Sequence, residues 1–315
     1  MSLQTLDYEE EIIGNIRDGI PVSLERALLV LSGLKTDGEI RSYQCKIDDI
    51  FSRFVKKCYD NILSDHSSPP PYLHRSIAKC LFEYLWNSKP KRFGEHFFLT
   101  DVIDAQLDSD LHRLVGTCVG LTSLYSVLGL RVGLNLSLLV GSDHLLSRLR
   151  VGPETIAIDH TDPQGFDCRS GEDFREAPLL TLSANVLNSR GLRNERNGKF
   201  VAAKGDYQKA LLVNPEYANA CNNRGNMRFR EENMEGAIAD YTEAVRLNPC
   251  LCEAYCNRGM ARQRLGRYDE AREDYHTAMS TNPEYPDARK CLQLLDDGRA
   301  SVQRGDAEDA EKCCR

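Results

Sequence analysis

The sequence has no excess of positive charge. Its 47 acidic residues outnumber its 40 lysines and arginines, which gives a formal net charge of −7 and a pI near 5.6. Because binding to nucleic acid phosphates needs a basic surface, this balance argues against a nucleic-acid-binding protein. With 41% hydrophobic and 28% charged residues, the composition is typical of a soluble globular protein.

The sequence also lacks a secretion signal. Its first twenty residues, MSLQTLDYEEEIIGNIRDGI, are acidic and have no basic start followed by an apolar core. We therefore expect a cytoplasmic protein whose twelve cysteines are mostly reduced. No CxxC pair or zinc-finger spacing is present, and His160, Asp162 and Cys168 do not have the spacing of metal ligands. We expect neither a metal nor another cofactor.

A long uninterrupted apolar run is missing as well. Residues 119–140 have about the length of a membrane-spanning helix, but Arg131 lies in this stretch. Gly133 and Asn135 indicate the end of a helix and the start of a strand. We therefore expect no contact with a membrane.

The C-terminal half is repetitive. Shifting the sequence by 34 residues aligns identical residues in three copies. The matching sets are Gly191, Gly225 and Gly259; Ala203, Ala237 and Ala271; Tyr207, Tyr241 and Tyr275; Ala210, Ala244 and Ala278; and Pro215, Pro249 and Pro283. Small residues at two helix crossings, an aromatic between them and a terminal proline resemble the tetratricopeptide repeat.

This periodicity predicts the organisation of the chain. Three repeats occupy residues 184–217, 218–251 and 252–285, and a capping helix follows within a second domain of residues 184–303. Residues 304–315 form an acidic tail. Because one repeat cannot bury its apolar face alone, the three copies are expected to stack as an all-α solenoid.

The resemblance to tetratricopeptide repeats also implies a binding site. In that family the first helix of each repeat lines a concave groove that holds peptides. The corresponding residues are Asn188, Asn222, Asn223 and Asn257, together with Arg196, Arg230 and Arg264, which occupy one position in all three repeats. Guanidinium groups grip carboxylates with two hydrogen bonds, so the arginines favour an acidic protein or peptide partner. Alternatively, they pair with neighbouring glutamates on a solvated face.

One class of acidic ligand does not fit the groove. The groove that takes a chaperone C-terminus needs lysines at two positions that Asn188 and Glu253 occupy here. The resemblance therefore does not predict a chaperone C-terminus as the ligand.

The N-terminal domain, residues 1–183, is predicted to combine helices with a small sheet. Residues up to about 113 read as helical, with prolines in DHSSPPP at 65–71 excluding one continuous helix. Thr117 is a candidate N-cap for a helix that begins at Cys118 and runs to about Val132. Three strand-like segments, 134–140, 144–151 and 154–160, follow and predict an antiparallel meander.

Three residues on these elements could form a catalytic triad. Cys118 stands at the start of a helix, His144 at the start of the second strand and Asp159 at the end of the third. A helix N-terminus and a neighbouring imidazolium favour a thiolate, and a carboxylate can orient the imidazole. The turn near Gly152 lies about midway between His144 and Asp159, as antiparallel pairing requires. An alternative is that Cys118 is a packing residue, as most cysteines are.

The segments LHRLVGTCVGLTSLYSVLGL, GSDHLLSRL and IAIDHTDPQGF resemble the transglutaminase-like superfamily of papain-type cysteine enzymes. The bacterial SirB-type branch, which joins such a core to tetratricopeptide repeats, is the more similar one. The resemblance implies an α+β transglutaminase-like domain followed by the solenoid. The chain departs from the branch at Ser142-Asp143-His144, where a Pro-Gly-His turn is usual.

Two functions follow from this resemblance. The first is cysteine-dependent acyl transfer, by amide hydrolysis or amide transfer, with Cys118, His144 and Asp159 as catalytic residues and a partner held in the repeat groove. The Cys118 backbone amide, with Gln106 or His112, is the candidate oxyanion hole. The second is an inactive scaffold of the same fold that acts in protein–protein interaction through its repeats.

Overall fold

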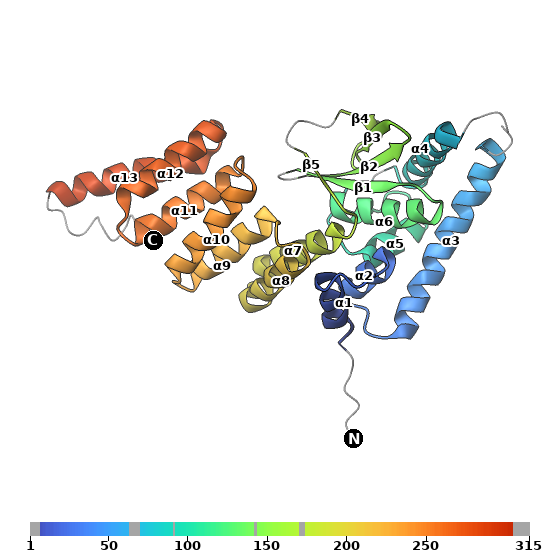
Figure 1. The fold of residues 1–315 in the computed structure, drawn as a ribbon, viewed down its shortest axis with the longest axis horizontal. Helices are drawn as coiled ribbons and strands as arrows, with labels where there is room; N and C mark the ends of the chain where they lie inside the picture. The colour runs from blue at the N-terminus through green and yellow to red at the C-terminus, as the bar shows by residue number, and fades with distance from the viewer. Residues whose placement is uncertain (1–6, 63–69, 91, 142–143, 170–173, 305–315) are drawn as a thin grey trace, which may run out of the picture. The chain divides into compact units, whose positions relative to one another are not determined.

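The chain folds into two compact units, residues 1–189 and 190–315, in a computed structural model that describes residues 7–62, 70–90, 92–141, 144–169 and 174–304 (Figure 1). Helix α7 (Thr181–Arg196) contains the division between the units. The predicted boundary after residue 183 lies in the same helix. From residue 305 onward, the predicted acidic tail lies outside the residues that the structure describes.

The N-terminal unit begins with the helical region that the sequence predicts. Its helices are α1 (Tyr8–Arg17), α2 (Leu24–Leu31), α3 (Asp37–Ile62), α4 (Pro70–Ser88), α5 (Leu99–Leu107) and α6 (Cys118–Arg131). Asp7 and Ser23 cap α1 and α2, since each side chain accepts a hydrogen bond from a backbone N–H in the first turn. Most of the DHSSPPP segment lies outside the described residues.

A five-stranded antiparallel sheet follows the helices. Its strands are β1 (Leu136–Val140), β2 (Leu145–Val151), β3 (Glu154–Ile158), β4 (Phe166–Cys168) and β5 (Arg175–Ala177), in the order β4-β3-β2-β1-β5. The arrangement of β1, β2 and β3 confirms the antiparallel meander predicted from three strand-like segments. The edge strands β4 and β5 were not predicted, because three residues are too few to show an alternation.

Helix α6 lies at the centre of this unit. It packs against strands β1 and β2 and against helices α2, α4 and α5 (Figure 1). Leu121, Leu124 and Leu128, at positions i, i+3 and i+7 of one helix face, are fully buried. Residues 119–140 are thus divided between a buried helix and a strand. No helix among the described residues has the length and apolar character needed to span a bilayer.

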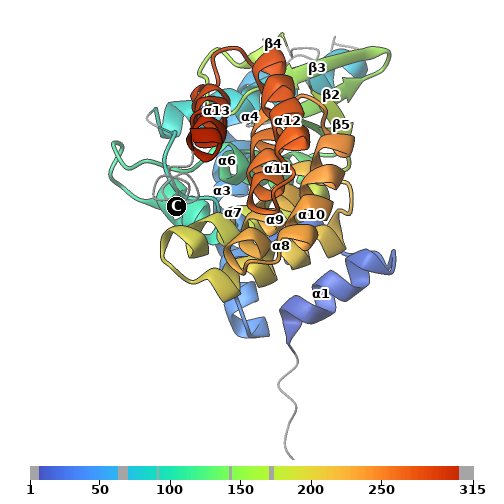
Figure 2. The ribbon, with the colours of Figure 1, turned by 90° about the vertical axis from the view of Figure 1, so that its left-hand side faces the viewer.

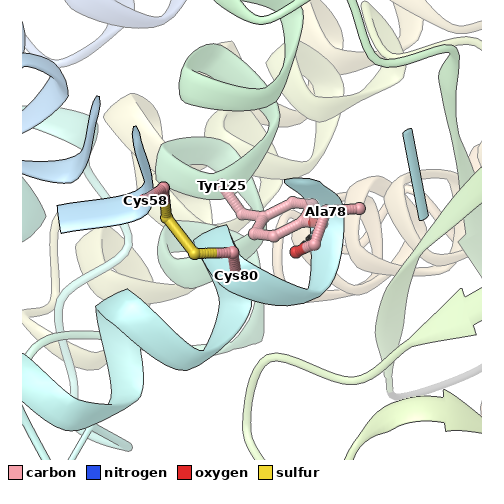
Figure 3. The surroundings of a disulfide bond; sticks show 4 residues. All are labelled: Cys58, Ala78, Cys80 and Tyr125. Atoms are coloured by element: carbon pink, nitrogen blue, oxygen red, sulfur yellow. Dashed lines mark hydrogen bonds between the residues drawn. A yellow bond between two sulfur atoms is a disulfide. The ribbon is translucent and has the colours of Figure 1, made fainter. Parts of the chain in front are cut away.

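A disulfide links two helices of the same unit. Cys58 on α3 is bonded to Cys80 on α4 (Figure 3). Eight further cysteines in the described part of the chain are free thiols, in line with the expectation of mostly reduced cysteines. The linked pair was not predicted, because its 22-residue separation carries no sequence signature.

The second unit consists of antiparallel helix pairs. After the end of α7 come α8 (Phe200–Val213), α9 (Ala218–Arg230), α10 (Met234–Leu247), α11 (Cys252–Arg264), α12 (Tyr268–Thr281) and α13 (Pro286–Arg304). Helix α10 packs on α9 and α11, and α13 packs on α11 and α12, as Figure 2 shows from the end of the stack. These pairs form the helical repeat region expected in the C-terminal half, and the three exact repeat bounds and the capping role of α13 stay predictions.

The repeated glycines and tyrosines explain the close packing within each pair. A Cβ atom on Gly191, Gly225 or Gly259 would lie only 2.4–2.6 Å from Cε1 of the tyrosine sixteen positions later. The three tyrosines are essentially fully buried, at 0–1% exposure. Glycine is therefore needed wherever the aromatic ring rests on the first helix of a repeat.

A buried ion pair also repeats with the same period. The guanidinium of Arg190, Arg224 and Arg258 donates to the carboxylate of Asp206, Asp240 and Asp274, respectively, at 2.6–2.7 Å. The three aspartates are only 2–6% exposed. The second and third carboxylates also contact a second arginine, Arg228 or Arg262. These ion pairs were not predicted, although a charged residue that recurs at a fixed repeat position was a signal for them.

Candidate active site

Cys118 is the first residue of α6, as predicted. The Thr117 side chain accepts a hydrogen bond from Gly120 N at 3.4 Å and caps the helix. A Cβ on Gly116 or on Gly120 would lie 2.7 Å from the carbonyl oxygen of His96. These two glycines therefore let the segment around His96 pack directly against the helix start. The Cys118 thiol is partly exposed there.

His144 lies directly before β2 and is held by the turn that joins β1 to β2. Its backbone carbonyl accepts a hydrogen bond from Gly141 N at 2.9 Å, next to the paired residues Val140 and Leu145. Its side chain is 30% exposed. Ser142 and Asp143, where the chain departs from the Pro-Gly-His pattern, lie outside the described residues.

Asp159 follows β3 and begins a tight turn. Its backbone N–H donates to Gly165 O, and its Oδ1 accepts hydrogen bonds from the Thr161 backbone at 2.8 Å and hydroxyl at 2.6 Å. A Cβ on Gly165 would lie 2.2 Å from the carbonyl oxygen of Asp159, so only glycine fits there. This turn leaves Oδ2 of Asp159 available to His144.

The structure places the three predicted residues together. His144 Nε2 lies 2.9 Å from Asp159 Oδ2. Hydrogen bonds to Asp159 and then to the Cys118 side chain raise the pKa of His144 to about 10, against the lowering effect of burial. Since Asp159 occupies Nε2, Nδ1 is the ring nitrogen left for the Cys118 sulfur.

The Asp159 carboxylate stays ionised. Burial works to raise the pKa of Asp159, but its hydrogen bonds with His144 and Thr161 outweigh this effect and lower the pKa to about 2. At neutral pH the pair is therefore an imidazolium bound to a carboxylate. Such a pair can hand a proton to a leaving group while the carboxylate keeps the ring in place.

The two side chains suggested for the oxyanion hole have other surroundings. Gln106 is 7% exposed; its Oε1 accepts from Arg92 at 3.0 Å and its Nε2 donates to Ser88 Oγ at 3.3 Å. His112 is exposed in the turn after α5. The amide of Gln106 thus holds the buried Arg92. The better placed donor for an oxyanion is the Cys118 backbone N–H, because the first N–H groups of a helix have no acceptor within the helix.

His160 belongs to the interior and not to a metal site. It is 3% exposed, and its Nε2 lies 2.8 Å from Ser147 Oγ. Burial, and then the nearby charge of Arg92, lower its pKa to about 3, so the ring is neutral. Within the described residues, no group of three or more His, Cys, Asp and Glu side chains could hold a metal ion.

The asparagines predicted to line the groove are mostly buried. Asn188, Asn222, Asn223 and Asn257 are 2–9% exposed. Asn257 donates to Asn222 Oδ1 at 3.0 Å and Asn222 donates to Glu253 at 3.2 Å, which links α9 to α11. For Asn222 and Asn257, the amide groups therefore bond neighbouring repeats together and offer a ligand little surface.

The three arginines predicted for the groove are exposed. The guanidinium of Arg230 lies 4.0 Å from the centre of the Phe200 ring, and that of Arg264 lies 5.8 Å from the centre of the Phe229 ring. In the part of the chain that the structure describes, neither Arg196 nor these two forms an ion pair. The alternative in which they neutralise neighbouring glutamates is thus not what the structure shows.

Comparisons with known proteins agree with the repeat unit. A family model described as "Tetratricopeptide repeat" matches residues 252–285, and one described as "TPR repeat" matches residues 225–266. No curated protein matches the chain.

Solved structures that match part of this chain include three repeat domains. The first TPR of Spaghetti (RPAP3) bound to the HSP90 peptide SRMEEVD is 30% identical, with a TM-score of 0.36, over 38% of this chain and 94% of that one. The first TPR domain of human RPAP3 is 30% identical, with a TM-score of 0.37, over 38% and 95%. The Sgt2 TPR domain from Aspergillus fumigatus is 20% identical, with a TM-score of 0.37, over 38% and 82%. Taken with the helix pairs and the period of 34, the two family matches identify the C-terminal region of this chain as tetratricopeptide repeats.

Proposed function

We propose that the N-terminal unit carries out cysteine-dependent acyl transfer, by hydrolysis or transfer of an amide, and that the repeats bind a protein or peptide partner. The observation that supports the chemistry is the hydrogen bond between His144 and Asp159 at 2.9 Å, together with the Cys118 side chain that acts on the same imidazole. An α+β core that places these residues on a helix start and two strand ends agrees with the resemblance to the transglutaminase-like superfamily and its SirB-type branch.

Each residue has one role in this reaction. The Cys118 sulfur attacks the carbonyl carbon of the amide, and the negative charge on the oxygen is stabilised by the Cys118 backbone N–H at the start of α6. The imidazolium of His144 gives its proton to the leaving amine as the carbon–nitrogen bond breaks, which leaves a thioester on Cys118. Water or a second amine then attacks the thioester, and the proton that it loses returns to His144. Asp159 keeps the ring oriented in both steps.

Alkylation by iodoacetamide tests this chemistry. At neutral pH we expect Cys118 to react faster than Cys45 and Cys250, the two exposed free thiols of the described chain. His144→Ala should remove the difference. Equal labelling of the three cysteines, unchanged by His144→Ala, would refute the enzyme proposal and leave the inactive scaffold as the function of the chain.

The repeats are proposed to bind an acidic peptide through Arg196, Arg230 and Arg264. What supports this is that the three guanidiniums recur at one repeat position, are exposed and have no carboxylate partner among the described residues. A hydrogen bond between charged groups contributes about 1.5–3 kcal/mol, so each arginine that grips a carboxylate changes the affinity by roughly tenfold or more.

Binding of fluorescein-labelled hexaglutamate, measured by anisotropy, tests the arginine site. Arg230→Glu should weaken binding by about tenfold or more. The matched control is Arg246→Glu, because Arg246 is an exposed arginine of α10 that already pairs with Glu243. Equal effects of the two substitutions would contradict a specific arginine site.

A further inference from the structure

A second buried layer lies beneath the candidate triad. Each chain segment that carries a residue of the candidate triad also contributes one residue to this layer. Tyr125 lies two helical turns after Cys118 on α6, Ser147 lies on β2 shortly after His144, and His160 directly follows Asp159. The three side chains are 0%, 0% and 3% exposed, so the layer is closed to solvent.

His160 joins the members of this layer. Its Nε2 lies 2.8 Å from Ser147 Oγ. Its ring centre lies 4.3 Å from that of Tyr125 and 6.1 Å from that of Phe82 on α4. The Tyr125 hydroxyl donates in turn to Ala78 O on α4 at 3.0 Å (Figure 3). The His160 imidazole thus contacts helix α6, which carries Cys118, strand β2, which follows His144, and helix α4.

The turn after β3 links this contact to Asp159. Ser147 is paired with Ile158, the last residue of β3, and the His160 side chain reaches Ser147 from the turn that follows. Asp159, between Ile158 and His160, bonds to His144. A rotation of the backbone at 159–160 that moved the carboxylate off His144 would also pull His160 out of its buried site.

We propose that His160 is a positioning residue that holds Asp159 in line with His144 through its hydrogen bond to Ser147. This inference rests on the proposed role of Cys118 as a nucleophile. His160 has no proton-transfer role in this proposal. The charged groups that act on its ring are Arg92, which is buried, and the adjacent Asp159 and His144.

Iodoacetamide labelling of Cys118 across pH, in the full chain, tests the inference. His160→Phe keeps an aromatic ring of similar size but cannot bond to Ser147, and Ser147→Ala removes the other partner with almost no change of volume. Since small misplacements of reacting groups can cost up to about a hundredfold in rate, each variant should slow labelling at pH 7 by roughly tenfold or more and move the pH midpoint upward. The double variant should be no slower than either single one, because both remove the same hydrogen bond. His160→Gln, which restores a hydrogen-bonding group near the position of Nε2, should recover most of the rate.

Two controls separate positioning from general stability. Tyr125→Phe removes the hydrogen bond to Ala78 but keeps the ring against His160, so it should leave the labelling midpoint unchanged even if it lowers the resistance to urea. Ser147→Ala is the decisive variant if His160→Phe does not fold. If the labelling rate and midpoint of Ser147→Ala match those of the wild type, His160 is a packing residue and the inference is wrong.

The outcome also distinguishes this inference from the proposed function. A wild-type Cys118 that labels fast and depends on His144, but is indifferent to His160 and Ser147, overturns the positioning role alone. A wild-type Cys118 that labels no faster than Cys45 overturns both.

Discussion

The buried carboxylate of Asp240 gives the sharpest prediction about stability. It is 3% exposed and accepts hydrogen bonds from Arg224 Nε at 3.0 Å and Nη2 at 2.6 Å, and Arg228 Nη1 lies 2.9 Å away. Asp240→Ala would leave two partly buried guanidiniums with no counterion. Breaking such a pair from one side costs about 3–5 kcal/mol, so we expect a loss of that size in the stability of the repeat unit.

Two related variants test the physical reason. Asp206→Ala should cost less, because Asp206 accepts from one arginine, Arg190, and from the neutral amide of Asn194. Replacing Asp240 by Ala and both of its arginines by Met should recover most of the loss, since it is the unpaired charge, and not the missing pair, that destabilises.

Hydrogen–deuterium exchange followed by mass spectrometry suits this measurement. The opening free energy can be read from peptides of α9 and α10, while peptides from the β1-β2-β3 meander serve as an internal reference. The reasoning would be refuted if Asp240→Ala changed exchange in α9 and α10 by less than about 1 kcal/mol, or if the triple variant were no more stable than Asp240→Ala.

Three other predictions follow from the described contacts. Gly225→Ala, whose Cβ would lie 2.6 Å from the Tyr241 ring, should lower the urea stability of the repeats by about 1–3 kcal/mol, whereas Gly205→Ala, which meets no atom within 4 Å, should be neutral or stabilising. The His144–Asp159 pair should stabilise the N-terminal unit most between about pH 4 and 6.5. The share of His144, whose pKa rises from 6.5 to about 10, is lost as pH rises through 10, and the share of Asp159, whose pKa falls from 3.8 to about 2, is lost as pH falls through 2. Thermal melting of wild type and His144→Gln across pH checks this window, and parallel curves would contradict it. Gly165→Ala should slow Cys118 alkylation, because its Cβ would lie 2.2 Å from the Asp159 carbonyl oxygen, and an unchanged rate would contradict the tight turn.

Local signals carried most of the fold prediction. The period of 34 determined the repeats, because each glycine–tyrosine contact is a local feature that recurs. The Thr117 cap placed the start of α6, and the turn at Gly152 brought the strands next to His144 and Asp159 side by side. The positions of Cys118, His144 and Asp159 on these elements were therefore predictable from signals that each lie within a few residues, while their catalytic role stays a prediction.

What the sequence did not reveal depends on contacts between distant residues. The Cys58–Cys80 disulfide joins two helices whose packing has no sequence signature. The burial of Asn222 and Asn257 arises from the stacking of one repeat on the next, so residues predicted to face a ligand bond to each other instead. His160 was considered only as a metal ligand, because nothing in IAIDHTD indicates that Ser147 and Tyr125 enclose it.

The most direct test of the central claim is to trap the thioester on Cys118. The full chain is mixed with p-nitrophenyl acetate, quenched in acid within the first turnover and digested, and the acetylated peptides are identified by mass spectrometry. We predict one acetyl group on Cys118, which neutral hydroxylamine removes and which is absent from His144→Ala. Acetylation of Cys118 no greater than that of the exposed Cys45 and Cys250, and independent of His144, would contradict the account.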